Sequence, residues 1–211
     1  MSTPPPHPPP SAVTVFGDRL ALAERYVTQL AGPGIVRGLI GPREVPRLWE
    51  RHVLNCAVAV ELVPEGASVA DVGTGAGLPG LVWTIVRPDV HVTLVEPLLR
   101  RTRFLEEMVE HLNLSNVAVR RNRAEELAGR MHVDVVTARA VAPLATLARW
   151  TLPLLKADGM LMALKGQSVS NELASAESEL TKLGATSWSV REFGAGIVDP
   201  LTRVAVVTLG G

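Results

Sequence analysis

A glycine-rich loop carries the residue types and spacing best suited to ligand chemistry. The loop lies between an apolar, strand-like run at 69–72 and a helical pattern that opens with Pro79 and Gly80. Its glycines are Gly73, Gly75 and Gly77. Glycine permits a tight turn and lets a ligand approach the bare backbone. The free amides at the start of the following helix suit anionic or polar groups, so this stretch is predicted to bind a ligand.

An acidic residue after the next apolar run adds a second element to this pattern. The run covers 91–95 and ends at Glu96. An acid about 20 residues beyond a glycine loop is placed to accept hydrogen bonds from ribose hydroxyls. The loop and the acid together predict a nucleoside-binding site.

Two cofactor classes fit this prediction. Gly75, Gly77 and Gly80 match the dinucleotide fingerprint, so a nicotinamide-dependent oxidoreductase is one hypothesis. Asp71 precedes the loop, and Asp-x-Gly-x-Gly-x-Gly followed by a distal acid resembles the first two motifs of S-adenosylmethionine-dependent methyltransferases. In that family the glycine loop holds the methionine end of the cofactor and the second acid holds the ribose. The resemblance therefore favours S-adenosyl-L-methionine, with its site at Asp71, Gly73, Gly75, Gly77 and Glu96.

Composition places the chain among ordinary globular proteins. Its 211 residues, 47% of them hydrophobic and 20% charged, fit one domain. Lys+Arg 21 balances Asp+Glu 21, so a nucleic-acid partner would have to meet a local basic patch. The single Cys56 fits a reducing compartment, no run approaches the ~20 apolar residues of a membrane helix, and the first residues lack the apolar region of a signal peptide. We expect a soluble, cytoplasmic protein that makes no membrane contact.

The order of elements predicts an α/β fold. Residues 1–16 are proline-rich and expected to be disordered, and residues 17–211 are expected to form a single methyltransferase domain. Within it, 17–66 indicate a helical N-terminal extension and 67–211 a Rossmann-like core in which strands and helices alternate. Such alternation implies a mostly parallel sheet. By resemblance to class I S-adenosylmethionine-dependent methyltransferases, we expect seven strands with the last one antiparallel.

Polar residues or glycine follow the predicted carboxyl ends of five strands. They are Gly73, Glu96, the run Arg123, Ala124 and Glu125, Arg139, and Lys165 with Gly166. Ligands of open α/β sheets bind beyond these ends, so these residues are expected to converge on one rim. Arg139 interrupts an apolar run, and a cation in such surroundings needs a partner, which favours a role in the site.

Histidine and cysteine give little support for acid–base or metal chemistry. His52 shares a predicted helical face with Trp49, Val53 and Cys56, where a histidine is most often a hydrogen-bonded core residue. A catalytic role for His52 therefore ranks second. No metal-ligand spacing appears among the five histidines and the lone cysteine, so we predict no bound metal.

Six segments occur in order along the chain, at 49–55, 71–80, 100–105, 123–125, 138–140 and 163–166. Together they resemble the bacterial ribosomal RNA small subunit methyltransferase G family, also called glucose-inhibited division protein B, over about residues 17 to 209. The resemblance implies methyl transfer to N7 of a specific guanine in 16S ribosomal RNA. By motif match, cofactor contacts fall on Gly73, Leu78, Glu96, Ala124, Glu125 and Arg139. The chain departs from the family's usual pattern at 32–42.

The implied reaction requires little acid–base catalysis by the protein. Guanine N7 has an exposed lone pair and no proton, so its attack on a sulfonium methyl group needs no general base or metal. Alignment can then supply roughly 7–11 kcal/mol in favourable cases. Lys165 and Arg139 are the candidate catalytic residues and would position the substrate through O6 or a phosphate, because a donor on N7 would occupy the nucleophile. His52 is then unnecessary as an acid or base.

Two arginine clusters are candidate RNA contacts. They comprise Arg100, Arg101 and Arg103, and Arg120, Arg121 and Arg123, with Lys165 as a further contact. Phosphate neutralisation by these side chains would make binding salt-sensitive. Because the formal net charge is +0, we expect recognition of a 30S subunit or assembly intermediate and not of naked RNA. We also expect a monomer. Methylation of another RNA or of a small molecule, and a non-catalytic nucleoside-binding module, are the open alternatives.

Overall fold

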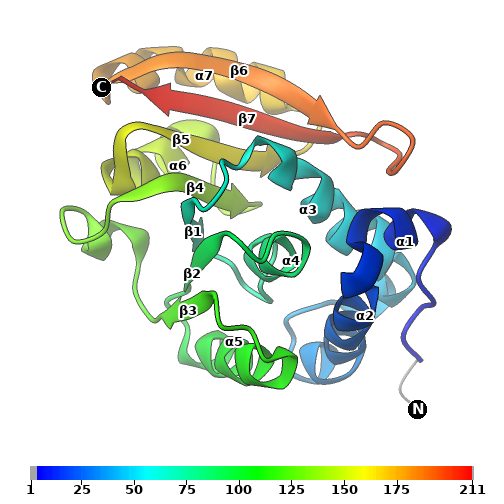
Figure 1. The fold of residues 1–211 in the computed structure, drawn as a ribbon. Coiled ribbons are helices and arrows are strands. Elements are labelled where there is room, and N and C mark those ends of the chain that lie inside the picture. The colour runs from blue at the N-terminus through cyan, green and yellow to red at the C-terminus, as the bar shows by residue number, and fades with distance from the viewer. Residues whose placement is uncertain (1–3, 211) are drawn as a thin grey trace.

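The computed structural model describes residues 4–210 and is built on one seven-stranded sheet (Figure 1). The strand order is β3-β2-β1-β4-β5-β7-β6. The strands are β1 (Ser68–Val72), β2 (His91–Val95), β3 (Val117–Arg120), β4 (Val133–Arg139), β5 (Leu155–Lys165), β6 (Ala185–Phe193) and β7 (Thr202–Leu209). Every neighbouring pair is parallel except β5 with β7 and β6 with β7. The last strand alone therefore runs against the others, which confirms the predicted fold class.

Helices cover both faces of this sheet. They are α4 (Gly80–Val86), α5 (Leu99–Leu112), α6 (Leu144–Thr151) and α7 (Val169–Lys182), with the short turns η6 (Ala124–Leu127) and η7 (Leu152–Leu154). Successive strand residues point to opposite faces, so Val135 belongs to the hydrophobic cluster that includes α4 and α5, and Val136 to the cluster that includes α6 and α7. Parallel strands that are buried on both faces consist of continuous apolar residues. The positions of these strands could therefore be predicted from the sequence.

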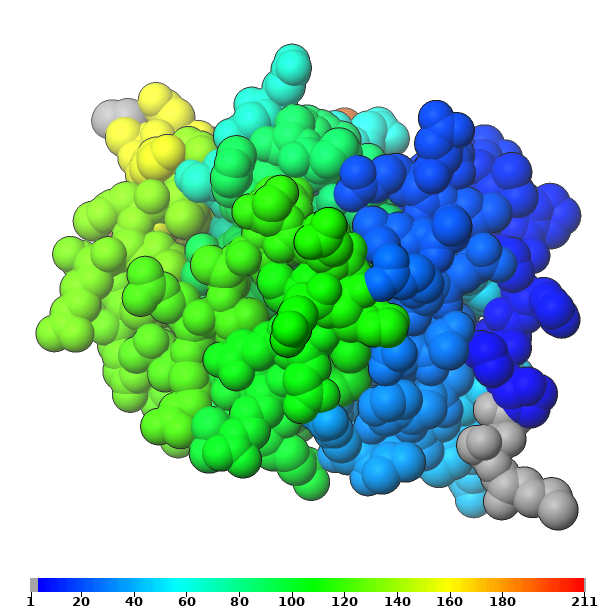
Figure 2. Space-filling view, turned by 60° about the horizontal axis from the view of Figure 1, so that its bottom comes forward, coloured from blue at the N-terminus to red at the C-terminus, as the bar shows by residue number. Residues whose placement is uncertain are grey.

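The N-terminal third is helical and irregular. Its elements are α1 (Pro10–Phe16), η1 (Gly17–Arg19), α2 (Leu20–Gln29), η2 (Leu30–Gly34), η3 (Pro42–Arg47), η4 (Leu48–Leu54), α3 (Asn55–Ala57) and η5 (Val58–Leu62). Buried residues of these elements share one hydrophobic cluster with β1, α4 and α5, so the extension packs into the core. Arg37, in the divergent segment 32–42, pairs with Glu107 of α5 at 2.6 Å, and Figure 2 shows the blue N-terminal segment lying against the green α5 region.

The expected disorder of residues 1–16 is wrong for residues 10–16, which form α1. Proline is tolerated in the first helical turn, and Ala12 and Phe16 on this helix are buried. Residues 4–9 have no helix or strand, but the indole of Trp49 donates a hydrogen bond to the Pro6 carbonyl at 2.9 Å. Burial of two apolar side chains therefore overrides the proline-rich pattern, and residues 1–3 lie outside the described part of the chain.

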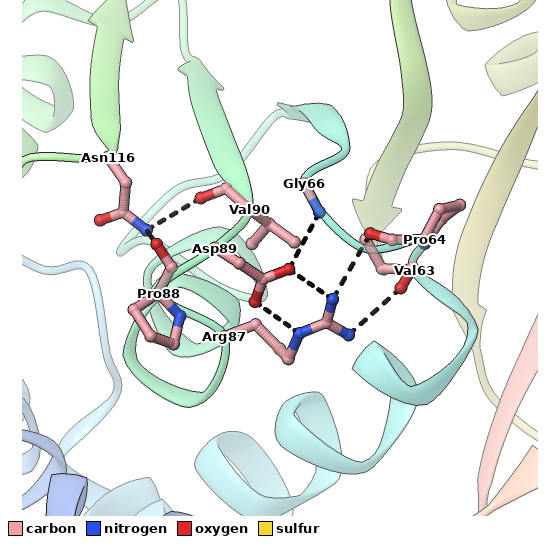
Figure 3. A network of polar contacts seen from close by, with 8 residues as sticks. All are labelled: Val63, Pro64, Gly66, Arg87, Pro88, Asp89, Val90 and Asn116. Carbon is pink, nitrogen blue, oxygen red and sulfur yellow. Dashed lines mark hydrogen bonds and ion pairs between the residues drawn. The ribbon is translucent and has the colours of Figure 1, made fainter.

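A polar network fastens the sheet at the end away from the predicted rim (Figure 3). The Arg87 guanidinium donates to both Asp89 carboxylate oxygens, at 2.7 and 2.6 Å, and to the Val63 carbonyl at 3.2 Å. The Gly66 amide donates to Asp89 at 3.0 Å, and Asn116 donates to the Val90 carbonyl at 2.9 Å. These contacts join the loops that enter β1, β2 and β3, so charge at this end has a structural role.

Gly80, at the start of α4, lies where a larger residue would collide with β1 and β2. An added Cβ would stand 2.5 Å from Leu94 Cδ2 and 2.7 Å from Asp71 Oδ2. We therefore expect Gly80→Ala to lower the free energy of unfolding by about 1–3 kcal/mol, the usual cost of overpacking, as measured by urea denaturation. Gly32→Ala is the control, because a Cβ there meets nothing within 4 Å. Equal stability of the two variants would contradict this prediction.

Candidate functional site

Two adjoining cavities open at the carboxyl ends of the parallel strands. The first, called here the Glu96 cavity, has a volume of about 390 Å³. The second, the Lys165 cavity, has a volume of about 780 Å³. Ala140, the residue after β4, lines both. The rim predicted from the strand ends is therefore a pair of cavities that meet at one residue.

Glu96 is held rigidly in the wall of the first cavity. Its side chain is only 1% exposed. One carboxylate oxygen accepts hydrogen bonds from the Gly75 amide at 3.2 Å and from Arg101 Nη1 at 3.3 Å, and the other accepts from the Leu98 amide at 3.1 Å. Each carboxylate oxygen can accept more than one hydrogen bond. The protein thus fixes the orientation of this carboxylate and leaves it able to accept hydroxyl donors.

The other walls of the Glu96 cavity are mostly apolar. They are formed by Val72, Gly73, Val95, Pro97, Leu98, Arg101, Asn122, Arg123, Ala124, Glu125, Val141 and Trp150. Val141 lies over the loop so closely that a Cβ on Gly73 would stand 2.8 Å from its Cγ2. A small, mainly apolar cavity with one fixed carboxylate suits a nucleoside, whose base is flat and whose sugar donates hydrogen bonds.

The glycine loop itself is held from below by Asp71. This carboxylate is fully buried, and one of its oxygens accepts hydrogen bonds from the Thr74 hydroxyl and, at 2.8 Å, from the Gly80 amide. Burial raises the pKa of Asp71 to about 7, against the opposing effect of these hydrogen bonds. The Tyr26 hydroxyl of α2 donates to the Ala76 carbonyl at 2.8 Å, so the extension also supports the loop.

These positions divide the predicted cofactor-site residues into two groups. Gly73, Glu96, Ala124 and Glu125 line the Glu96 cavity, whereas Asp71, Gly75, Gly77 and Leu78 are not among the described residues that line it. Asp71 shapes the loop from beneath, and a Cβ on Gly77 would stand 2.4 Å from Leu81 Cδ1, so this glycine is required by packing. The sequence did not predict that Trp150 and Val141 line this cavity, because neither residue belongs to a recognisable motif.

Lys165 is anchored in the wall of the second cavity. Its side chain is 8% exposed, and its ammonium group donates to the Ala142 carbonyl at 2.5 Å and to Glu172 at 2.8 Å. The Leu144 amide also donates to Glu172, at 3.2 Å. The remaining lining residues are Arg47, Glu50, Arg51, Asn55, Arg139, Ala140, Leu164, Gly166, Gln167, Asp199, Pro200, Leu201 and Arg203. A cation of fixed position in a large, polar cavity suits a substrate with anionic or carbonyl oxygens.

Arg139 lines the Lys165 cavity and has the partner that its apolar surroundings predicted. Its Nη2 lies 2.5 Å from His52 Nδ1, and its Nη1 lies 3.1 Å from Cys56 Sγ. His52 Nε2 in turn lies 2.9 Å from a carboxylate oxygen of Glu44. Burial and the neighbouring Arg139 lower the pKa of His52, which favours a neutral ring. The structure places Arg139 and Lys165 in the wall of the Lys165 cavity, whereas His52 contacts Arg139 without being among the residues that line it, and Arg139 is not among those of the Glu96 cavity.

The predicted RNA-binding arginines separate into two environments. Arg100 and Arg103 are exposed on α5, and Arg120 and Arg121 are exposed around the end of β3. Arg101 instead faces the Glu96 cavity and pairs with its carboxylate, and Arg123 lines the same cavity. The clusters identified from the sequence are therefore not uniform surface patches. In the first cluster the reason is that neighbouring residues of helix α5 point in different directions.

The described residues contain no group of three or more histidine, cysteine, aspartate or glutamate side chains that could hold a metal ion. Between residues 4 and 210, none of the helices has the length and apolar character needed to cross a membrane.

Comparisons with known proteins agree with this geometry. The family model described as rRNA small subunit methyltransferase G matches residues 19–200. The ribosomal RNA small subunit methyltransferase G of Streptomyces avermitilis is 58% identical over 206 residues, covering 97% of this chain and 87% of the relative. The protein of that name from Thermobifida fusca is 55% identical over 202 residues, covering 96% and 85%.

Solved structures give the fold. A putative S-adenosyl-L-methionine-dependent methyltransferase from Methanococcus maripaludis has a TM-score of 0.59 at 12% identity, covering 84% of this chain and 90% of that one. A methyltransferase from Pyrococcus furiosus has a TM-score of 0.56 at 17% identity, covering 71% and 78%.

Proposed function

This chain belongs to the rRNA small subunit methyltransferase G family, and from that membership we propose that it methylates N7 of a specific guanine in 16S ribosomal RNA. It is a methyltransferase that uses S-adenosylmethionine. The observation that carries the proposal is the pair of cavities that meet at Ala140. A methyl donor in one and an acceptor base in the other would have their reacting atoms next to this residue.

The Glu96 cavity suits the nucleoside part of S-adenosylmethionine. Its carboxylate would accept hydrogen bonds from the ribose hydroxyls, and the buried Ala124, with Leu98 and Trp150, would enclose the adenine. Gly73 allows close approach of a ligand to the backbone. When bound, the cofactor supplies a methyl group activated by a positively charged sulfur. The proposed direct contacts are Gly73, Glu96, Ala124 and Glu125, with Asp71, Gly75, Gly77 and Leu78 shaping the loop around them.

The Lys165 cavity suits a single unstacked nucleotide. Enzymes that modify a base inside a folded nucleic acid commonly extrude it into a pocket and read its edges by hydrogen bonds. Because N7 must keep its lone pair free, Lys165 and Arg139 would donate to O6 or to a phosphate and leave N7 unbound. No general base is required, so the protein's contribution is alignment of the base with the methyl group.

RNA outside the cavity would meet exposed cations. The exposed Arg47 and Arg51 border the Lys165 cavity, and Arg100 and Arg103 are exposed on α5. The formal net charge of +0 supports recognition of a folded 30S subunit or assembly intermediate over naked RNA, because a neutral chain gains little from non-specific phosphate contacts. We further propose that the protein acts as a cytoplasmic monomer.

The proposed function is tested by following the methyl group. Purified protein is incubated with methyl-labelled S-adenosylmethionine and small ribosomal subunits from cells that lack this gene. The label is expected in one guanine of the ribosomal RNA, at a position that becomes prone to strand cleavage as N7-methylguanine does. Label on naked RNA equal to that on subunits would refute the subunit preference. Cofactor binding without label on any nucleotide would instead support a non-catalytic role.

A further inference from the structure

Two short turns of the N-terminal region bring Glu44 and His52 against the end of β4. Glu44 belongs to η3 and His52 to η4, and both lie far from Arg139 in sequence. The contacts run in a line, from Glu44 to His52 at 2.9 Å and from His52 to Arg139 at 2.5 Å. The His52 side chain is 10% exposed, so solvent competes little for these bonds. We infer that Glu44 and His52 are positioning residues that fix the orientation of Arg139 toward the substrate.

Arg139 determines which ring nitrogen of His52 carries the hydrogen. A guanidinium group has only N–H donors, so His52 Nδ1, which faces it, must accept and cannot carry a hydrogen. The hydrogen of the neutral ring is then on Nε2, which donates it to the Glu44 carboxylate. A carboxylate that accepts from one ring nitrogen selects the tautomer and orientation of the ring. Glu44 therefore acts on Arg139 through His52.

The remaining contacts of Arg139 explain what this orientation achieves. Nη1 donates to Cys56 Sγ at 3.1 Å and lies 3.4 Å from the His52 carbonyl, so both Nη atoms are directed at η4 and α3. Within residues 4–210, the structure gives Arg139 Nε no hydrogen-bond acceptor. Protein atoms thus engage the two Nη atoms of the guanidinium. The remaining N–H groups of Arg139 are available to a ligand in the cavity that it lines.

This restraint matters for an N7 methyltransferase, and the inference rests on the proposed function. A free arginine commonly binds guanine in a bidentate manner, through O6 and N7 together. That contact would occupy the lone pair that must attack the methyl group. Holding the Nη1–Nη2 fork against His52 and Cys56 removes the end-on form of this binding mode, in which both Nη atoms face the base. Arg139 then presents only its Nε edge to the cavity, and the fixed direction of this edge decides whether it meets O6 or a phosphate and not N7.

The test compares variants that remove or retain each hydrogen bond. His52→Leu removes the acceptor for Arg139, whereas His52→Asn keeps an amide oxygen close to the position of Nδ1. Glu44→Ala removes the partner of Nε2, whereas Glu44→Gln keeps an acceptor without the charge. Glu107→Gln, which disrupts the exposed ion pair with Arg37, is the control for loss of a carboxylate that contacts the N-terminal extension. Each variant is assayed for kcat and KM with small subunits, cofactor affinity and thermal unfolding.

We expect His52→Leu and Glu44→Ala to lower kcat/KM for subunits roughly 10- to 100-fold, the range for a lost hydrogen bond to a charged group. His52→Asn and Glu44→Gln should each recover most of that loss, and Glu107→Gln should match the wild type. Cofactor affinity should stay unchanged throughout. Nitrogen-15 NMR of the wild-type imidazole should show the hydrogen on Nε2, independently of turnover.

Three results would overturn the inference while leaving the proposed function intact. One is an Nδ1–H tautomer in the NMR spectrum. Another is a wild-type kcat/KM in His52→Leu. The third is an equal loss of cofactor affinity and activity in all variants, which would place the effect in the Glu96 cavity. Absence of guanine N7 methylation by the wild-type protein would instead refute the proposed function, and the NMR result would still decide whether the hydrogen-bonded line exists.

Discussion

Replacing Glu96 with alanine is expected to weaken S-adenosylmethionine binding roughly 100-fold, because hydrogen bonds to a charged acceptor are among the stronger ones in proteins. The carboxylate is 1% exposed and already oriented by the Gly75 and Leu98 amides, so little ordering remains to be done when a ribose binds. Calorimetric titration with the cofactor measures the change. Glu96→Gln should bind with an affinity between those of the wild type and Glu96→Ala, because an amide keeps one acceptor oxygen.

The control is Glu106→Ala, an exposed carboxylate of α5 that is not among the residues of the Glu96 cavity. It should bind the cofactor as the wild type does. If Glu96→Ala also binds normally while its thermal unfolding is unchanged, the nucleoside is not held by this carboxylate, and the assignment of the Glu96 cavity would have to be abandoned.

Asp71→Asn is expected to become more stable, relative to the wild type, as the pH rises from about 5 to about 8. Burial raises the pKa of Asp71 to about 7 in the folded protein, and the unfolded chain has the ordinary value of 3.8. Between these values the unfolded state releases a proton that the folded state keeps, so wild-type stability falls as the pH rises through this window. Asparagine cannot ionise. The difference in unfolding free energy should therefore grow in favour of the variant by about 2–3 kcal/mol.

An asparagine side chain at this position can retain the native contacts that Asp71 makes. Its amide oxygen can accept from Thr74 and Gly80, and its nitrogen would replace Asp71 Oδ1, which has no hydrogen-bond partner in the described part of the chain. Asp89→Asn is the control, since Arg87 holds the pKa of Asp89 well below its usual range and its titration is complete below pH 5. Urea denaturation at both pH values measures the effect. A pH-independent difference for Asp71→Asn would mean that Asp71 is ionised in the fold.

The sequence located the parts of the site that depend on local pattern. Gly73 and Glu96 follow buried strands, and the apolar runs that mark those strands are set by burial on both faces of a parallel sheet. Parallel strands have their carboxyl ends on the same edge of a sheet. The sequence therefore also predicted that residues following different strands would lie close together. The antiparallel β7 was expected from family resemblance, and its register with β5 agrees.

Contacts that depend on three-dimensional packing were not predictable in this way. The contacts from Glu44 to His52 and from His52 to Arg139 join η3, η4 and β4. No spacing of residues in the sequence predicts them. Asp71 was assigned to the cofactor because its motif position suggests a contact, yet the carboxylate points beneath the loop. The helix at Pro10–Phe16 was missed because its stability comes from burying Ala12 and Phe16, and not from local propensity.

The reversed direction of β7 means that the two cavities are bordered by different parts of the chain. Because this strand runs against its neighbours, its first residues, Thr202 and Arg203, reach the same edge as the ends of β4 and β5, and Thr202 bonds Asn55 there. The Lys165 cavity is thus bordered by the chain at 199–203, and the Glu96 cavity by loops after β1, β2 and β3. An insertion before β7 is therefore expected to change the Lys165 cavity and to leave the lining of the Glu96 cavity unaltered.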